Sequence, residues 1–110
     1  MGEIEKRQID IGKNIKMIEF LKCELLNSIA SLFELLVKGF KEGQEAIVEV
    51  LANIILVTYS LGKRLGIDYH TVDKKVQEKA KLHMLEEHHL EKWYGDLSSI
   101  SQYLKNRGKQ

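Results

Sequence analysis

The chain lacks proline altogether, and it has a single cysteine, Cys23, among its 110 residues. Because proline is the residue that most often interrupts a helix, its absence favours long uninterrupted helices. A lone cysteine excludes an intrachain disulfide and is typical of a reducing compartment, so we expect a cytoplasmic protein. Cys23 stands in an apolar helical stretch, and we interpret it as a small core residue rather than as a nucleophile.

An excess of one charge and long apolar runs are also missing. The formal net charge is +1, which gives no overall field to attract nucleic acid or an anionic membrane. No uninterrupted apolar run approaches the roughly 18 residues that a membrane span needs, and the N-terminus has no signal-peptide layout. We therefore expect neither nucleic acid nor a membrane among the partners.

Helical periodicity is clearest from about residue 13 to residue 38. Apolar residues there recur at steps of three or four, which lines one face of a helix, and a second stripe runs beside the first. The stripes are Ile18, Leu21, Leu25, Ile29, Leu32 and Leu36, and Leu26, Ala30, Phe33 and Val37. Together they make a face too wide for one short partner helix to cover. Residues 1–12 are expected as a separate N-terminal segment.

The rest of the chain predicts three more helices. A loop between Gly39 and Gly43 leads to a helix over about 44–64 that is apolar nearly all round, so we expect neighbours on several sides. Residues 71–87 form a mostly charged helix, which Asp68 or Thr71 would cap. A short helix follows with Asp96 as its N-cap, and residues 106–110 are expected to fray.

These elements predict an all-α domain spanning 1–110, built on an antiparallel helical hairpin with one or two shorter helices. One hairpin cannot bury both faces of both helices. Pairing two hairpins across a two-fold axis would give a four-helix-bundle core, so we expect a homodimer. The alternative is a monomer whose third and fourth helices fold back over the exposed face.

A metal-like cluster stands near the end of the third predicted helix, over residues 83–89. His83 and Glu87 are four residues apart and would share a helix face. The pattern falls short of H-E-x-x-H, which needs two histidines at that spacing. Opportunistic zinc binding by His83, Glu87 and His88 is one interpretation, and a solvated polar patch is the preferred one.

Three stretches carry a family resemblance: Glu24-Leu-Leu-Asn-Ser-Ile-Ala-Ser-Leu-Phe-Glu34, Val50-Leu-Ala-Asn53 and Leu61-Gly-Lys-Arg-Leu-Gly-Ile-Asp68. The sequences of these stretches resemble the MazG-like family of all-α nucleotide pyrophosphohydrolases, and in particular its short single-domain branch. The resemblance implies conversion of nucleoside triphosphates to monophosphate and pyrophosphate. It also implies Mg²⁺ as cofactor, held by carboxylates at helical spacing on two neighbouring helices.

The carboxylates of that family pattern are mostly replaced in this sequence. The first run falls on Ser28, Ser31 and Glu34, and the second falls on Val50 and Asn53. The resemblance thus implies a metal site of Glu34 and Asn53, with Ser28 and Ser31 lining the pocket. Asparagine offers a carbonyl oxygen but no charge, so the site should hold Mg²⁺ weakly without substrate phosphates.

Glu49, one residue off the family register, is a further candidate metal ligand. The resemblance also implies phosphate contacts from Lys63 and Arg64, with Lys74 and Lys75 behind them. A nucleoside triphosphate is then the candidate small-molecule ligand.

Two interpretations remain open for these polar residues. Asn53, Ser28 and Ser31 either hydrogen-bond across the hairpin as core polar groups or line a surviving ligand pocket. The function divides in the same way, between a pyrophosphohydrolase and a non-catalytic dimerisation, regulatory or nucleotide-sensing module. Convergence of the acidic side chains and Asn53 on one cleft would separate them; the residues concerned are Glu24, Glu34, Glu49 and Asn53.

Overall fold

A computed structural model describes residues 2–39, 43–86 and 89–107, with the side chains of residues 2–9, 90 and 91 outside that description. Every regular element in these ranges is a helix: α1 (Gly2–Lys38), α2 (Gln44–Arg64), α3 (Tyr69–Leu85), α4 (His89–Tyr94) and α5 (Asp96–Arg107). The all-α prediction is confirmed. Contacts divide the chain into two compact units, Met1–Ile67 and Asp68–Gln110.

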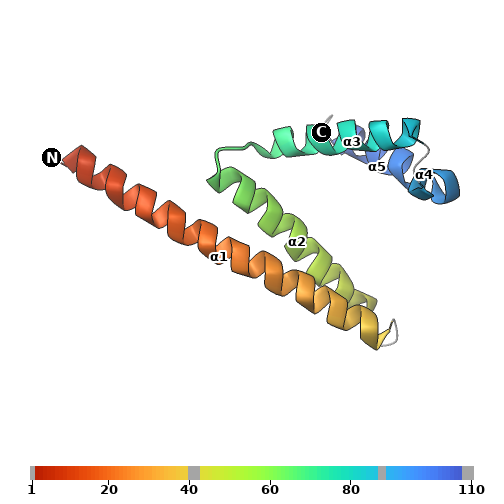
Figure 1. The fold of residues 1–110 in the computed structure, drawn as a ribbon, viewed down its shortest axis with the longest axis horizontal. Helices are drawn as coiled ribbons and strands as arrows, with labels where there is room; N and C mark the ends of the chain where they lie inside the picture. Colours follow the sequence, from red (N-terminus) through yellow and green to blue (C-terminus); the bar gives the residue numbers. More distant parts are fainter. Residues whose placement is uncertain (1, 40–42, 87–88, 108–110) are drawn as a thin grey trace. The chain divides into compact units, whose positions relative to one another are not determined.

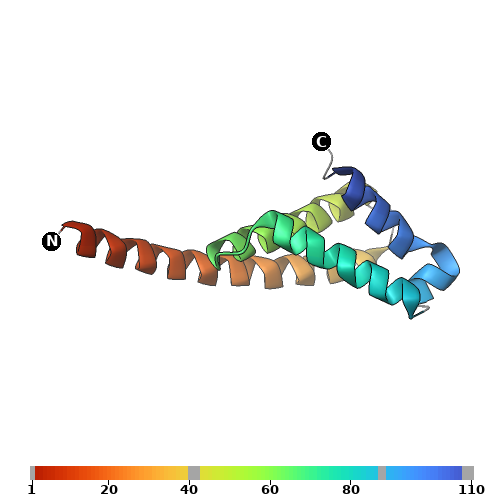
Figure 2. The same ribbon diagram turned by 90° about the horizontal axis from the view of Figure 1, so that it is seen from above.

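The first unit is the predicted antiparallel hairpin, with α1 and α2 lying side by side along the length of α2 (Figures 1 and 2). The α1 positions that face α2 recur every three or four residues, and Leu21 is the most buried apolar one, at 8% exposure. Val57 of α2 is 4% exposed and is the centre of the small core. The hairpin therefore closes on one seam only, and the outer faces of both helices stay exposed.

The first helix begins earlier than its apolar pattern predicted. It is helical from Gly2, so residues 2–12 continue α1 instead of forming a separate segment. The sequence up to Gln8 is rich in Glu, Lys, Arg and Gln, which are good helix formers, and it lacks proline. Gly12 costs this helix about 1 kcal/mol relative to alanine but does not stop it. Since α1 has 37 residues and α2 has 21, the start of α1 runs past the end of α2 (Figure 1).

A glycine-based stop ends α2 at the boundary between the two units. Gly66 has a φ of 83°, a conformation that side chains with a Cβ rarely adopt. The Ile67 amide donates to the Gly62 carbonyl at 2.8 Å, and the Gly66 amide donates to the Lys63 carbonyl at 3.1 Å. These two bonds make a Schellman motif, which satisfies carbonyls that the helix end leaves without partners.

The second unit pairs α3 with α5 in antiparallel order. The Ser98 hydroxyl at the start of α5 donates to the Met84 sulfur at the end of α3, at 2.9 Å. At the other end, Arg107 donates to Asp73 at 2.6 Å, joining the end of α5 to the start of α3. Ala80 and Leu97 are the buried apolar residues of this unit.

The ends of the shorter helices differ from the sequence-based bounds by a few residues. Asp68 occupies the N-cap of α3 as predicted, although its side chain makes no cap hydrogen bond. Asp96 is the first residue of α5 rather than its N-cap, because the Ser99 amide bonds to the Gly95 carbonyl. Asn106 and Arg107 are still helical, and the remainder of the predicted frayed tail lies outside the described residues.

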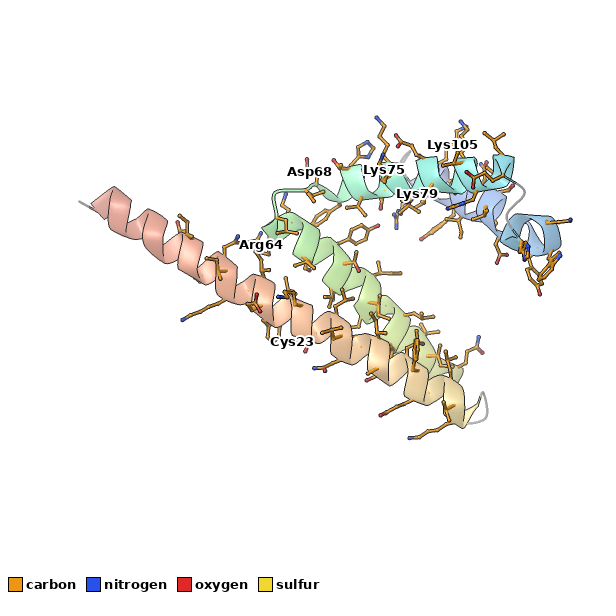
Figure 3. All side chains as sticks on the ribbon, viewed as in Figure 1. Cys23, Arg64, Asp68, Lys75, Lys79 and Lys105 are labelled. Carbon is orange, nitrogen blue, oxygen red and sulfur yellow. The ribbon has the colours of Figure 1, made fainter. Side chains whose placement is uncertain are left out.

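Cys23 is exposed, so the prediction that it is a core residue is wrong. It follows the seam residue Leu21 by two positions, which rotates it by about 200° to the outer face of α1. Its label in Figure 3 stands on the side of α1 away from α2.

One helix, α2, is long and apolar enough to cross a membrane by length and composition alone. The sequence contains no uninterrupted apolar run of that size, because charged and polar residues interrupt this helix. Only a small share of the helix is buried in the unit. A helix that packs on a second partner has the same composition, so the expectation of no membrane stays a prediction.

Candidate functional site

A shallow hollow lies across the seam between α1 and α2, with a volume of about 280 Å³. We call it the acidic hollow. Its polar lining comes from both helices: Glu24, Asn27, Ser28 and Ser31 of α1, and Glu49 and Asn53 of α2, with Val50 beside them. The described residues that line it include two carboxylates and no basic side chain.

Helical spacing explains why these residues meet. On α1, Glu24, Ser28 and Ser31 follow one another at steps of four and three, so they share one face. On α2, Glu49 and Asn53 are four residues apart and share the face that meets α1. Sequence reasoning named Glu24 among the acids that could converge with Asn53 but not among the metal ligands, and its spacing to Ser28 was the signal that could have placed it here.

A hydrogen bond closes the floor of the acidic hollow. The side-chain amide of Asn53 donates to the Ser28 hydroxyl oxygen at 2.6 Å, and Ser28 is 7% exposed. This pair therefore bridges the hairpin, as the first interpretation expects, and it also lines the hollow. With its amide nitrogen bound to Ser28, Asn53 keeps a carbonyl oxygen that can accept from, or bind to, a ligand.

The residues that line the acidic hollow can bind a hard cation such as Mg²⁺ only if a ligand supplies further oxygen donors. Glu24, Glu49 and the Asn53 carbonyl supply oxygen, which Mg²⁺ prefers, and Mg²⁺ is commonly held by one or two carboxylates together with substrate phosphates. Within the described ranges, no three His, Cys, Asp or Glu side chains come together as a metal cluster. The donor set thus fits a magnesium–phosphate complex better than a bare ion.

Glu34, the carboxylate that the resemblance placed in the metal site, is not among the residues that line the acidic hollow. It follows Ser31 by three positions and stands one turn nearer the loop end of α1, where its side chain is exposed. The acids that converge with Asn53 are therefore Glu24 and Glu49.

The predicted phosphate contacts, Lys63 and Arg64, lie in the last turn of α2. Lys63 is ten residues from Asn53, which is about 15 Å along the helix axis. Arg64 lines a separate hollow of about 600 Å³ with α1 residues that include Asp10 and Lys13, and its carbonyl accepts from the Asn14 amide at 3.0 Å. The structure brings neither basic residue to the acidic hollow.

The predicted metal-like cluster near residue 83 is described only in part. His83 Nδ1 lies 3.5 Å from a carboxylate oxygen of Glu86, one turn on. Glu87 and His88 fall outside the described residues. Lys74 and Lys75, suggested as more distant phosphate contacts, lie on α3 in the second unit.

Comparison with known proteins gives one match. The model of the MazG-like family matches residues 11–97, which include the whole acidic hollow and reach into both units. Searches of curated proteins and of solved structures found no significant match.

Proposed function

The chain belongs to the MazG-like family, and from that premise we propose that the acidic hollow binds nucleoside triphosphates with Mg²⁺ and hydrolyses them to monophosphate and pyrophosphate. Family membership relates the chain to nucleoside triphosphate pyrophosphohydrolases. The observation that carries the proposal is the convergence of Glu24, Glu49 and Asn53 from two helices on one hollow.

Each residue of the hollow has a defined task in this proposal. Glu24 and Glu49 would hold the cation through their carboxylates, and the Asn53 carbonyl adds a neutral oxygen. Bound Mg²⁺ neutralises phosphate charge and lowers the pKa of an attacking water. Ser28 fixes the Asn53 amide by their hydrogen bond, so the carbonyl needs no reorientation when a ligand arrives.

The loss of carboxylates relative to the family pattern predicts slow turnover. A site with two acids binds the ion weakly until phosphate oxygens complete the coordination. We therefore expect Mg²⁺ and nucleotide to bind cooperatively, each raising the affinity for the other.

The test measures pyrophosphate release and nucleotide binding with Mg²⁺ or Mn²⁺, for a panel of ribo- and deoxyribonucleoside triphosphates. Glu24→Gln and Glu49→Gln remove one carboxylate each from the hollow at nearly constant volume. Glu34→Gln removes the same charge from the same hairpin outside the hollow, which makes it the matched control.

We expect each hollow variant to weaken metal-dependent nucleotide binding by at least about tenfold, and the control to bind like the parent. Turnover that both hollow variants abolish would support the enzyme. Binding without turnover in the parent would leave a nucleotide-sensing protein, and equal losses in all three variants would contradict a site at the hollow.

Homodimerisation is the second part of the proposal. The second apolar stripe of α1 is exposed, with Leu26 at 68%, Phe33 at 65% and Val37 at 87%. Large apolar side chains of α2 are exposed as well: Val48, Leu51, Ile55 and Leu56. A second copy would bury both faces in a four-helix core, in keeping with the tendency of exposed apolar patches to mark interfaces.

The same surface supports an alternative of a different class, a helical dimerisation or regulatory module without catalysis. Light scattering of Phe33→Lys tests the dimer, and the nucleotide assay separates the two functions. Loss of the dimer is expected in either case. Unchanged partner binding in Glu24→Gln and Glu49→Gln, with no nucleotide bound by any form, would favour the module.

A further inference from the structure

A polar groove runs between α3 and α5 in the second unit, with a volume of about 440 Å³. We call it the lysine groove. Its α3 wall includes Lys74, Gln77, Glu78 and Lys81, and its α5 wall includes Ser101, Gln102 and Lys105 (Figure 3 labels Lys105). The Met84–Ser98 hydrogen bond stands at one end of the helix pair, and the Asp73–Arg107 ion pair stands at the other.

The spacing of the lining residues shows that each wall is one helix face. Lys74, Gln77 and Lys81 are separated by three and four residues, and so lie along one side of α3. Ser101, Gln102 and Lys105 occupy the matching side of α5. The groove therefore presents ammonium, amide and hydroxyl groups from two directions, all of which can donate hydrogen bonds.

The two carboxylates at the groove, Glu78 in its lining and Asp73 near its end, are already engaged. Glu78 bonds to Lys75 at 2.8 Å, and Asp73 bonds to Arg107 at 2.6 Å. Across the described residues, no carboxylate lies within ion-pair distance of Lys74, Lys81 or Lys105. The groove lining thus carries three lysines and one carboxylate, Glu78, which is paired with Lys75 and also interacts with the charge of Lys74. The remaining excess of positive charge favours an anion from solution.

A second hollow of about 320 Å³ continues the groove toward the end of α5. It shares Lys74, Gln77 and Lys105 with the first, and His70 and the Asp73–Arg107 ion pair add to its lining. Pockets of a few hundred Å³ suit small molecules rather than extended polymers. An elongated anion could therefore contact lysines along the length of both hollows.

We propose that the lysine groove binds a phosphate-bearing small molecule, with Lys74 and Lys81 on one side of the phosphates and Lys105 on the other. This site is separate from the acidic hollow and does not depend on the function proposed for it. The family match ends at residue 97, so the α5 wall with Ser101, Gln102 and Lys105 lies beyond it. The family match thus covers the α3 wall of the groove and leaves out its α5 wall.

Phosphate is the favoured chemistry because several oxygens on one group can accept from several donors at once. Hydrogen bonds between ammonium groups and phosphate oxygens are charge-assisted and stronger than neutral ones. A chain of phosphates could be a free polyphosphate or the tail of a nucleotide, and the two share the same contacts with lysine.

The experiment measures binding of inorganic tripolyphosphate by calorimetry, at about 150 mM salt, close to physiological ionic strength. EDTA is present throughout, so that metal-dependent binding at the acidic hollow does not contribute. Lys81→Gln/Lys105→Gln removes one charge from each wall. Lys79→Gln/Lys92→Gln removes two charges from the same unit at exposed positions outside the groove lining and is the matched control.

We expect the groove variant to lose at least about tenfold in affinity, since it loses two charge-assisted contacts, and the control to lose little. Tighter binding of ATP than of tripolyphosphate would identify a nucleotide as the ligand, and equal or weaker binding would identify the phosphate chain alone. Equal losses in both variants would show nonspecific attraction and overturn the site. Absence of binding by the parent would overturn it too, as would binding of an RNA or DNA oligonucleotide in place of tripolyphosphate.

Discussion

The α1–α2 hairpin and the α3–α5 pair are both antiparallel helix pairs, but different polar interactions join their helices. In the first, neutral Asn53 bonds to Ser28, which is nearly buried. In the second, Arg107 bonds to Asp73 at the solvent-exposed end of the helices. Burying an amide and a hydroxyl that satisfy each other costs far less than burying two charges, so the depth of the position selects the chemistry of the bridge.

The pockets of the two helix pairs also differ in the sign of their charge. The acidic hollow has carboxylates and no basic side chain among its described lining residues, whereas the lysine groove has three lysines. Paired helices of similar geometry thus offer sites for opposite ions. The lesson is that helix faces set where a site forms, and individual side chains decide what it binds.

The largest expected effect comes from placing a charge in the seam of the hairpin. Val57→Asp should lower the free energy of unfolding by about 3–5 kcal/mol, because it buries a carboxylate without a partner. Thr58→Asp is the control, since Thr58 is the next residue and is exposed. Urea unfolding followed by circular dichroism measures both. Similar losses of unfolding free energy for the two variants would mean that water reaches position 57 despite its burial.

The Asn53–Ser28 hydrogen bond should contribute less to the free energy of unfolding than the apolar seam does, but by a measurable amount. Asn53→Ala leaves the Ser28 hydroxyl without its donor, and we expect a loss of about 1–2 kcal/mol in the free energy of unfolding. A double-mutant cycle with Ser28→Ala isolates the pair, and its coupling energy should be about 1 kcal/mol. A coupling energy near zero would show that the hydrogen bond contributes only local order.

The Arg107–Asp73 bridge should contribute less to stability than the Asn53–Ser28 bridge. Arg107→Gln removes the ion pair with Asp73, whose side chain is 27% exposed while that of Arg107 is 39% exposed. We expect a loss of about 0.5 kcal/mol, which concentrated salt should erase by screening. Thermal unfolding at low and high salt checks this. A loss that persists in salt would indicate packing by the Arg107 side chain rather than attraction between charges.

The ion pair between Lys75 and Glu78 of α3 should have the smallest effect, which only a measurement on the Glu78 side chain itself can detect. The hydrogen bond and charge of Lys75 lower the pKa of Glu78 below its usual value. The stabilising effect of the ionised Glu78 is therefore present above its ordinary pKa and is lost as the pH falls through the lowered one. An NMR titration of the Glu78 carboxyl should show the lowered midpoint, and Lys75→Gln should return it toward normal. An identical midpoint in the variant would contradict this cause.

Much of the fold follows from the pattern of apolar residues. The spacing predicted the α1–α2 hairpin and the charged α3, because a face with period 3.6 has few alternatives in a chain without proline. The early start of α1 was missed, since a helix that has no partner helix needs no apolar stripe to mark it. Cys23 was wrongly predicted to be buried because the two neighbouring apolar stripes of α1 do not show which face of the helix meets α2.

The sequence predicted the location of the candidate site better than it predicted which acidic residues line it. Ser28, Ser31, Glu49 and Asn53 were singled out and do line one hollow. Glu34 was favoured by alignment with the family pattern, but the register of α1 turns Glu24 toward Asn53 instead. The lysine groove lies between helices whose pairing the sequence did not reveal, because α5 is short and its groove-facing residues are polar.

The family match ends at residue 97 and so includes only the first two residues of α5, the helix that forms one wall of the lysine groove. That placement has an evolutionary consequence. Substitutions in the last dozen residues can create, retune or erase the groove while every residue of the acidic hollow stays as it is. Selection can therefore act on the two pockets separately, and related chains that share the hollow are free to differ in what, if anything, their final helix holds.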